Sequence, residues 1–250
     1  MEFPAPFGPQ AYEGLRVYLS GVLGSLPAPP RAILMVSAHW EEGLPTVSSA
    51  PAPSMLFDYY GFPPHTYQLN YPAPGAPELA ARVRTLLEGA GIHSASNAER
   101  GFDHGVFVPM LIIDPAARIP VLTLSLTADL DPARHWAVGA ALAPLRSEGV
   151  LIIGSGSSYH NLRAIFAGGP GGSEPFDAWL NDTAVQVAAA QRRARLLAWE
   201  QAPQARACHP REEHLIPLMV AAGAAEEDPG RATFRGRIGG KAYSCFSFGG

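Results

Sequence analysis

The stretch Ala32-Ile33-Leu34-Met35-Val36 is an unbroken apolar run with the length of a strand. Such a run predicts a strand that is covered on both faces, as in a sheet with helices on either side. Similar runs recur at 120–126 and 150–154. Helical patterns follow or separate these runs, at 77–90, 131–147 and 176–199. Strands that alternate with helices predict an α/β fold, a single-domain sandwich with a central mixed sheet flanked by helices.

A further helix is expected before the first of these strands. Apolar residues recur at spacings of three and four, which is the period of a helix with one buried face: Tyr12, Leu15, Leu19, Val22 and Leu26. Prolines between positions 27 and 30 end this pattern, because proline cannot continue a helix.

The segment 43–75 differs from the rest of the chain, because it is rich in proline and aromatic residues and shows little periodicity. It predicts a long ordered loop. Loops of this length inside compact domains are usually functional, so we expect this one to fold over a pocket. A surface covering for the sheet is the alternative interpretation.

Composition limits the classes of function. The 250 residues, 47% of them hydrophobic, are enough for one domain spanning 1–250. The net charge is −4 and Lys241 is the single lysine, so no nucleic-acid partner is expected. No secretion signal or membrane-spanning stretch occurs, which predicts a cytoplasmic location without a membrane partner. Cys208 and Cys245 form no redox or metal motif, and the glycine-rich segment 167–172 predicts a surface turn.

Four of the eight histidines lie in short polar segments where strands or loops end: His39, His104, His160 and His214. In open α/β sheets the ligand crevice lies at the carboxyl ends of the strands. Two of these residues, His39 and His160, follow the strands predicted at 32–36 and 150–154, so both are expected to line that crevice. Three of the other histidines, His65, His93 and His135, are expected to be structural or exposed.

Imidazole is the commonest protein ligand for iron and zinc, and it also transfers protons near neutral pH. A metal site and a proton-transfer site can therefore be built from one residue type. Carboxylates adjacent in sequence could orient the rings by accepting the second N–H: Glu41, Glu42, Asp103, Glu212 and Glu213. For Glu212 and Glu213 the alternative is a pair of solvated charges at the start of a helix.

The four segments together resemble the class III extradiol dioxygenase superfamily, in its DOPA 4,5-dioxygenase branch. They appear in the family's order and extend from about residue 12 to the end of the chain. The residues that carry the resemblance are Val36-Ser37-Ala38-His39-Trp40-Glu41, Phe102-Asp103-His104-Gly105-Val106-Phe107-Val108-Pro109, Gly154-Ser155-Gly156-Ser157-Ser158-Tyr159-His160-Asn161-Leu162-Arg163 and His209-Pro210-Arg211-Glu212-Glu213-His214-Leu215-Ile216-Pro217-Leu218.

The resemblance implies a metal site with defined roles. By this likeness His39 and His214 are metal ligands, and His160 stands beside the metal as a ligand or as the catalytic base. His104 assists from the surrounding shell. The implied cofactor is one divalent metal ion, Fe(II) or Zn(II). The implied reaction opens a small catecholic aromatic ring with O₂.

One departure from the family pattern lies at the beginning of the chain. The family has a His-Gly-Gly-Gly-Pro or His-Gly-Ser-Pro segment after its first strand, which supplies a further metal ligand. The nearest equivalent here is Phe7-Gly8-Pro9. We expect that the first strand and its ligand are missing, which would leave an empty sheet position beside 32–36. The alternative is a protein that lacks them by nature.

Two other functions remain open at this point. Three imidazoles with an open fourth position also describe a catalytic zinc site, so a zinc hydrolase on the same scaffold is one alternative. The other is a non-catalytic binding protein that has lost its first metal ligand. The sequence does not set the oligomeric state.

Overall fold

Five strands form the central sheet, in the order β3-β2-β4-β1-β5. The computed structural model describes residues 10–167 and 172–249. Phe7-Gly8-Pro9 and most of the glycine-rich segment predicted as a turn lie outside these residues. The strands are β1 (Ala32–Glu42), β2 (Thr46–Ser48), β3 (Ala95–Asn97), β4 (Val121–Thr127) and β5 (Val150–Ser155).

Strand β1 is an inner strand of the sheet, next to the edge strand β5, and it pairs in parallel with both β4 and β5. Its Ile33 is opposite Val121 of β4 and Leu151 of β5. Strand β2 runs antiparallel to β4 and parallel to β3, so the sheet is mixed. The predicted fold class, an α/β sandwich with a mixed central sheet, is confirmed.

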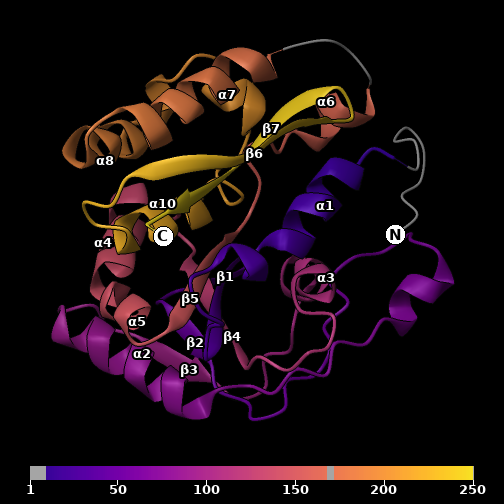
Figure 1. The fold of residues 1–250 in the computed structure, drawn as a ribbon, viewed down its shortest axis with the longest axis vertical. Helices are drawn as coiled ribbons and strands as arrows, with labels where there is room; N and C mark the ends of the chain where they lie inside the picture. Colours follow the sequence, from indigo (N-terminus) through magenta and orange to yellow (C-terminus); the bar gives the residue numbers. More distant parts are fainter. Residues whose placement is uncertain (1–9, 168–171, 250) are drawn as a thin grey trace.

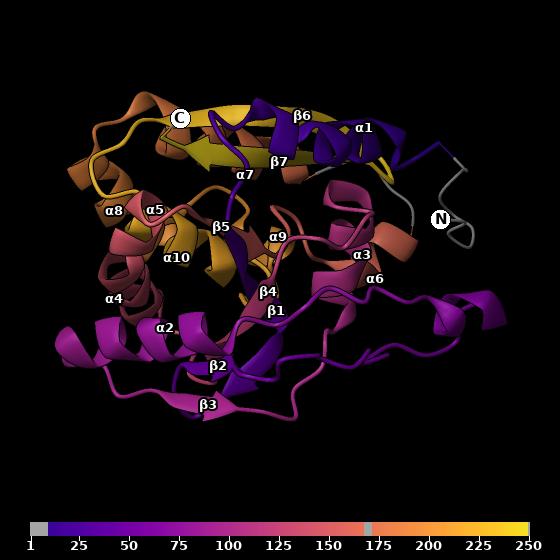
Figure 2. The same cartoon turned by 60° about the horizontal axis from the view of Figure 1, so that its bottom comes forward.

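The apolar run in β1 is continuous because each of its faces meets a separate layer of helices (Figure 2). Leu34 and Val36 belong to the core formed with helices α2 (Pro77–Gly89), α4 (Pro132–Leu142) and α10 (Ile216–Ala224). Ile33 and Met35 belong to the opposite core, formed with α3 (His104–Ile113). The side chains of a strand alternate between faces, so a strand covered on both sides has no polar positions.

A two-stranded antiparallel sheet follows the last core helix and was not predicted from the sequence. It consists of β6 (Gly230–Ile238) and β7 (Lys241–Phe248), drawn in yellow in Figure 1. Helix α1 (Glu13–Gly21) packs against β6, where the rings of Tyr18 and Phe234 lie 5.8 Å apart. Helix α7 (Ser173–Asn181) packs against β7.

Most predicted helices are present, with interruptions. The pattern at 131–147 divides at Pro144 into α4 and α5 (Pro144–Ser147), and the pattern at 176–199 divides into α7, a π-helical turn η3 (Asp182–Gln186) and α8 (Ala189–Leu197). The remaining short helices are η1 (Leu23–Ser25), η2 (Pro64–Gln68), α6 (Leu162–Phe166), η4 (Trp199–Gln201) and α9 (Ala205–Cys208).

Two expectations about the sheet were wrong. The segment 43–75 is not entirely loop, because it contains β2, whose three residues are all buried in the sheet. The position beside 32–36 is not empty, because β1 has β4 on one side and β5 on the other. In the central sheet, as far as the described residues show, the strands bordered on one side only are β3 and β5. Among the same residues, no helix combines the length and apolar character needed to span a membrane.

His135 connects the end of β4 to α4, as a structural histidine should. Its ring is buried; Nε2 accepts the backbone N–H of Thr127 at 3.0 Å, and Nδ1–H donates to the carbonyl of Asp131 at 2.7 Å. The first bond requires a neutral ring, because a protonated ring has no acceptor. Burial lowers the pKa of His135 below its ordinary value of 6.5.

This bond predicts a pH-dependent stability. Below about pH 6.5, His135 is protonated in the unfolded chain but stays neutral in the folded protein. The free energy of unfolding therefore falls as the pH decreases. In His135→Asn this contribution, at most about 1.4 kcal/mol per pH unit, should disappear. Stability at pH 7.5 should also drop by about 1–3 kcal/mol because the N–H of Thr127 loses its acceptor.

Urea unfolding between pH 5 and 7.5 measures both effects. Replacing the exposed His65 by Asn is the control, and it should leave stability at pH 7.5 unchanged. A pH dependence as steep in His135→Asn as in the wild type would contradict the assignment.

Candidate metal centre

Four histidines meet at the carboxyl-terminal end of the central sheet. His39 lies in β1, His104 begins α3, His160 follows β5 and His214 precedes α10. The ring centroid of His39 lies 3.9 Å from that of His104 and 4.8 Å from that of His214. The rings of His160 and His214 are stacked, with centroids 3.3 Å apart. The structure therefore brings together every histidine that the sequence selected as a site residue.

His39 owes its position to an irregularity in β1. The pairing with β4 shifts register between Val36 and Glu41, so the intervening residues are released from the ladder. Such irregularities redirect side chains at the ends of strands. Gly105 then approaches this segment closely, since a Cβ atom at that position would lie 2.8 Å from Cδ2 of His39. A side chain at position 105 would therefore require His39 or Ser37 to shift.

Asp58 orients the first pair of histidines from the loop after β2. Its Oδ1 accepts both the ring Nδ1–H of His104, at 2.8 Å, and the backbone N–H of His104, at 3.0 Å. Its Oδ2 lies 3.7 Å from Nδ1 of His39. Although burial acts to raise it, the hydrogen bonds from His104 lower the pKa of Asp58 to about 2. Asp58 is therefore an ionised acceptor under all ordinary conditions.

Glu213 performs the same task for the second pair. Its Oε1 lies 3.1 Å from Nδ1 of His160 and 2.9 Å from Nδ1 of His214. Burial acts to raise the pKa of Glu213, but the hydrogen bonds from both rings hold it well below its ordinary value. The second oxygen, Oε2, is buried and has no hydrogen-bond partner within the described residues, although Nη1 of Arg211 lies 3.8 Å away. Glu213 is thus part of the site and not a solvated charge.

The other carboxylates that the sequence offered as orienting groups have different partners. Glu41 forms a two-pronged ion pair with Arg211, with both N–O distances at 2.6 Å. Glu42 accepts the indole N–H of Trp40 at 2.8 Å. Glu212 pairs with Arg206, and Asp103 bonds to Ser37 and Arg100. None of these carboxylates forms a hydrogen bond with a ring of the four site histidines in the described residues.

The electrostatics of the cluster favour neutral imidazoles. Burial, together with the neighbouring rings, lowers the pKa of His39 to about 4 and that of His214 to about 3. A carboxylate can only accept, so the Nδ1 atoms that face Asp58 and Glu213 carry the protons of their rings. In the neutral form of His104, His160 and His214 this leaves Nε2 as a bare lone pair, which is the form that binds a metal or accepts a proton.

Two groups of side chains have the spacing needed to hold an ion. Both contain two histidines and one carboxylate whose ligand atoms lie within 4.8 Å of one another: His39, Asp58 and His104 in one, His160, Glu213 and His214 in the other. Neutral imidazoles and carboxylates are suitable donors for iron and zinc. Oε2 of Glu213, which is buried and accepts no hydrogen bond from the described residues, is a further donor atom in the second group. The donor set therefore fits a divalent cation.

Aromatic side chains from the same loop as Asp58 border the histidines. The ring of Tyr59 lies edge-on to His104 at 5.6 Å, and Phe57 packs against Tyr59 and Phe107. Two other aromatic residues, Trp40 and Tyr60, have different surroundings. The side chain of Trp40 is buried under the guanidinium of Arg100, and Tyr60 is 92% exposed.

Asp58 and His209 were not singled out from the sequence. Asp58 lies in a segment without periodicity, 46 residues before its partner His104, so no local signal marks it. His209 is buried against Phe176 and Trp199, and its Nε2–H donates to the carbonyl of Ser158 at 3.1 Å. It thereby supports the segment that carries His160.

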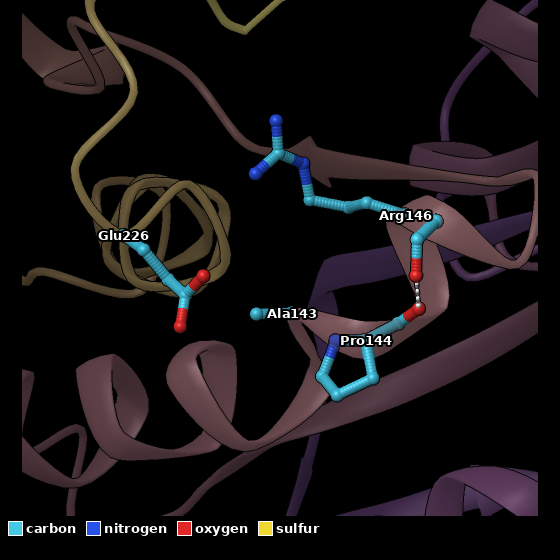
Figure 3. Close-up of a pocket in the computed structure, with 5 residues that line it drawn as sticks. Ala143, Pro144, Arg146 and Glu226 are labelled. Atoms are coloured by element: carbon cyan, nitrogen blue, oxygen red, sulfur yellow. Dashed lines mark hydrogen bonds between the residues drawn. The ribbon is translucent and has the colours of Figure 1, made fainter.

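A separate hollow of about 460 Å³ lies away from this cluster (Figure 3). It is lined by Ala143, Pro144, Arg146, Ser147 and Glu226. These residues include α5, which leads into the amino end of β5, whereas the histidines follow the carboxyl ends of the strands. Arg146, the cation of this hollow, is already paired with Asp228. The hollow therefore offers no comparable set of reactive groups.

The fold and this cluster define an α/β protein with a histidine-rich site at the carboxyl ends of its parallel strands. The family model described as the catalytic LigB subunit of aromatic ring-opening dioxygenase matches residues 20–245. The chain belongs to this family, and the resemblance seen in the four sequence motifs is confirmed.

Similar proteins include several enzymes with related names. The chain is 42% identical over 203 residues to a 4,5-DOPA dioxygenase extradiol of Beta vulgaris, covering 80% of this chain and 75% of the relative. It is 41% identical over 212 residues to the dioxygenase tasH of Hapsidospora irregularis, covering 80% of this chain but only 65% of the relative's length. A solved structure from Escherichia coli K12, described as an uncharacterized protein, superimposes with a TM-score of 0.75 at 28% identity, covering 93% of this chain and 91% of that one.

The close approach at Gly105 predicts a selective defect. In Gly105→Ala the added methyl would press on His39 and on Oγ of Ser37, 3.0 Å away, and the cost should be about 1–3 kcal/mol of stability. Binding of Zn²⁺, measured by competition with a chromophoric chelator, should weaken because His39 is displaced. Gly89→Ala is the matched control, since nothing lies within 4 Å of its Cβ position. Equal behaviour of the two variants would show that the contact does not constrain the site.

Proposed function

We propose that this chain is a metal-dependent extradiol dioxygenase that opens a catecholic aromatic ring with O₂. The observation that carries the proposal is the meeting of four imidazoles and two ionised carboxylates at one end of the sheet. Family membership supports a ring-opening reaction. The names of relatives that are 33–42% identical support a DOPA-like, catecholic substrate.

In this proposal His39 and His214 hold one divalent ion, Fe(II), and His160 is a third ligand or a base beside it. When bound, Fe(II) supplies a centre at which a catecholate and O₂ can exchange electrons. The two histidines suit this role because burial keeps their rings neutral at physiological pH. Asp58 and Glu213 fix the orientation of neighbouring rings, which is the usual task of carboxylates around ligating histidines.

His160 is the residue that we assign to proton transfer. Its Nδ1–H is held by Glu213, so Nε2 is free to take a proton from a catechol hydroxyl and to return one later. The imidazolium formed in this way lies beside the ionised Glu213, which stabilises its charge. His104, whose Nδ1–H is held by Asp58, would offer its Nε2 as an acceptor to a hydroxyl group of the substrate.

The loop that carries Asp58 would cover the substrate. Phe57 and Tyr59 supply apolar surface next to His104, where a planar ring can pack. The hydroxyl of Tyr59 donates to the carbonyl of Thr66 at 2.7 Å, so the loop is tied back on itself. This arrangement places apolar surface beside His104, on one side of the space in which the proton would be transferred.

Metal analysis combined with O₂ uptake tests the function. After anaerobic loading with Fe(II), the protein should hold about one ion per chain and consume one O₂ for each catechol opened. Turnover of an ester or amide without O₂ consumption would instead support a zinc hydrolase. Sub-stoichiometric metal and no turnover after loading would support a non-catalytic binding protein.

Replacement of single histidines separates proton transfer from metal binding. His160→Ala should keep most of its metal while turnover falls by about 10² or more, the usual size of a lost acid/base contribution. His39→Ala and His214→Ala should lose metal. Metal content by emission spectrometry and O₂ uptake are measured on the same samples.

Loss of metal in His160→Ala would identify that residue as a ligand. Wild-type metal and activity in all three variants would mean that the histidine cluster is not the active site.

A further inference from the structure

Asp103 is a fully buried carboxylate between the end of β1 and the start of α3. Its Oδ1 accepts the hydroxyl of Ser37 at 2.9 Å, and its Oδ2 accepts Nη2 of Arg100 at 2.7 Å. The guanidinium of Arg100 also lies over the ring of Trp40, 4.9 Å from its centroid. A buried charge is tolerated only when paired and hydrogen-bonded, and here each oxygen has its own donor.

Through these two donors Asp103 controls both backbone groups of His39. The N–H of His39 donates to Oγ of Ser37 at 3.2 Å, and its carbonyl accepts Nη2 of Arg100 at 3.2 Å. A hydroxyl has a single hydrogen, and Asp103 accepts it, so the lone pairs of Ser37 Oγ are left for His39. One carboxylate thus holds, through its two donors, the N–H and the carbonyl of His39, which lies where the pairing of β1 with β4 shifts register.

The same residue sets the start of the helix that carries His104. Asp103 occupies the N-cap position of α3, and its backbone carbonyl accepts the N–H groups of Val106 and Phe107 at 2.9 Å each. An aspartate at this position usually caps the helix with its side chain, a bond that contributes about 1 kcal/mol. The side chain of Asp103 makes no such bond and turns instead to Ser37 and Arg100. The side chain of Asp103 therefore contacts Ser37 of β1 and does not cap the helix.

We propose that Asp103 is the positioning residue that fixes His39 and His104 relative to each other. This inference rests on the proposed function only in treating His39 as a metal ligand. The alternative is a purely structural ion pair between Asp103 and Arg100. The two differ in what removal of the charge should do, because a structural pair affects folding whereas a positioning group affects the geometry of His39.

Asp103→Asn and a matched control distinguish these roles. Asp114 lies at the opposite end of α3, is also buried, and accepts the backbone N–H groups of Arg118 and Ile119 at 2.9 Å each. Both variants should lose stability. Asp103→Asn should bind Zn²⁺ about 10–100-fold more weakly, the usual effect of losing a group that orients a ligand, whereas Asp114→Asn should bind as tightly as the wild type.

A second variant and a second readout keep the test independent of folding and of the metal. Ser37→Ala removes only the hydroxyl between Asp103 and His39, and it too should weaken Zn²⁺ binding. In metal-free protein, amide hydrogen exchange at His39 should be at least tenfold faster in Asp103→Asn than in the wild type or Asp114→Asn.

The outcomes separate the two proposals. If the wild type binds no Zn²⁺, the proposed function fails while the exchange measurement still tests the positioning role. Unchanged exchange at His39 in Asp103→Asn, or an equal loss of Zn²⁺ affinity in Asp114→Asn, would overturn the inference. If Asp103→Asn does not fold, wild-type Zn²⁺ affinity in Ser37→Ala would overturn it as well.

Discussion

The site depends on keeping several imidazoles neutral at contact distance. The rings of His39, His160 and His214 have centroids 3.3–4.8 Å from their neighbours, a separation at which two protonated rings would repel strongly. Burial lowers the pKa of His39 and of His214 and so disfavours their charged forms. The carboxylates of Asp58 and Glu213 supply negative charge beside the rings. Asp58 accepts from the ring of His104, and Glu213 accepts from the rings of His160 and His214, so these three rings have fixed orientations before any ligand binds.

The topology explains how residues from distant parts of the chain reach this row. Because β1 is covered on both faces, one helix layer contributes α3 with His104, and the opposite layer contributes α10, which His214 precedes. The centre of the row comes from the strand between the layers, which carries His39. A sheet with one exposed face would supply only one of these flanking groups. The apolar run in β1 requires a helix layer on each face of the sheet. The same two layers therefore flank the site on both sides.

Sequence patterns predicted the parts of this arrangement that rest on local periodicity. The apolar runs in β1, β4 and β5 were long enough to predict strands. The chain direction of the runs at 32–36 and 150–154 then placed His39 and His160 after their carboxyl ends. Strands β2 and β3 have three residues each, too few for a pattern to emerge, and their pairing is long-range. Asp58 was missed and Glu213 was left ambiguous, because neither lies in a periodic pattern that marks its role. A carboxylate on an aperiodic segment shows its role only through a partner that the fold brings to it.

The ion pairs around the site differ in how much they contribute to folding stability, because they differ in burial. The pair between Glu41 and Arg211 has good geometry, but Arg211 is half exposed, and such pairs contribute about 0–1 kcal/mol to folding. Its effect is local, since it joins the end of β1 to the segment before Glu213. The pair between Asp103 and Arg100 is buried, where removing one partner leaves an uncompensated charge. The buried pair between Asp103 and Arg100 therefore constrains His39 from within the protein. The exposed pair between Glu41 and Arg211 only joins two surface segments beside the site.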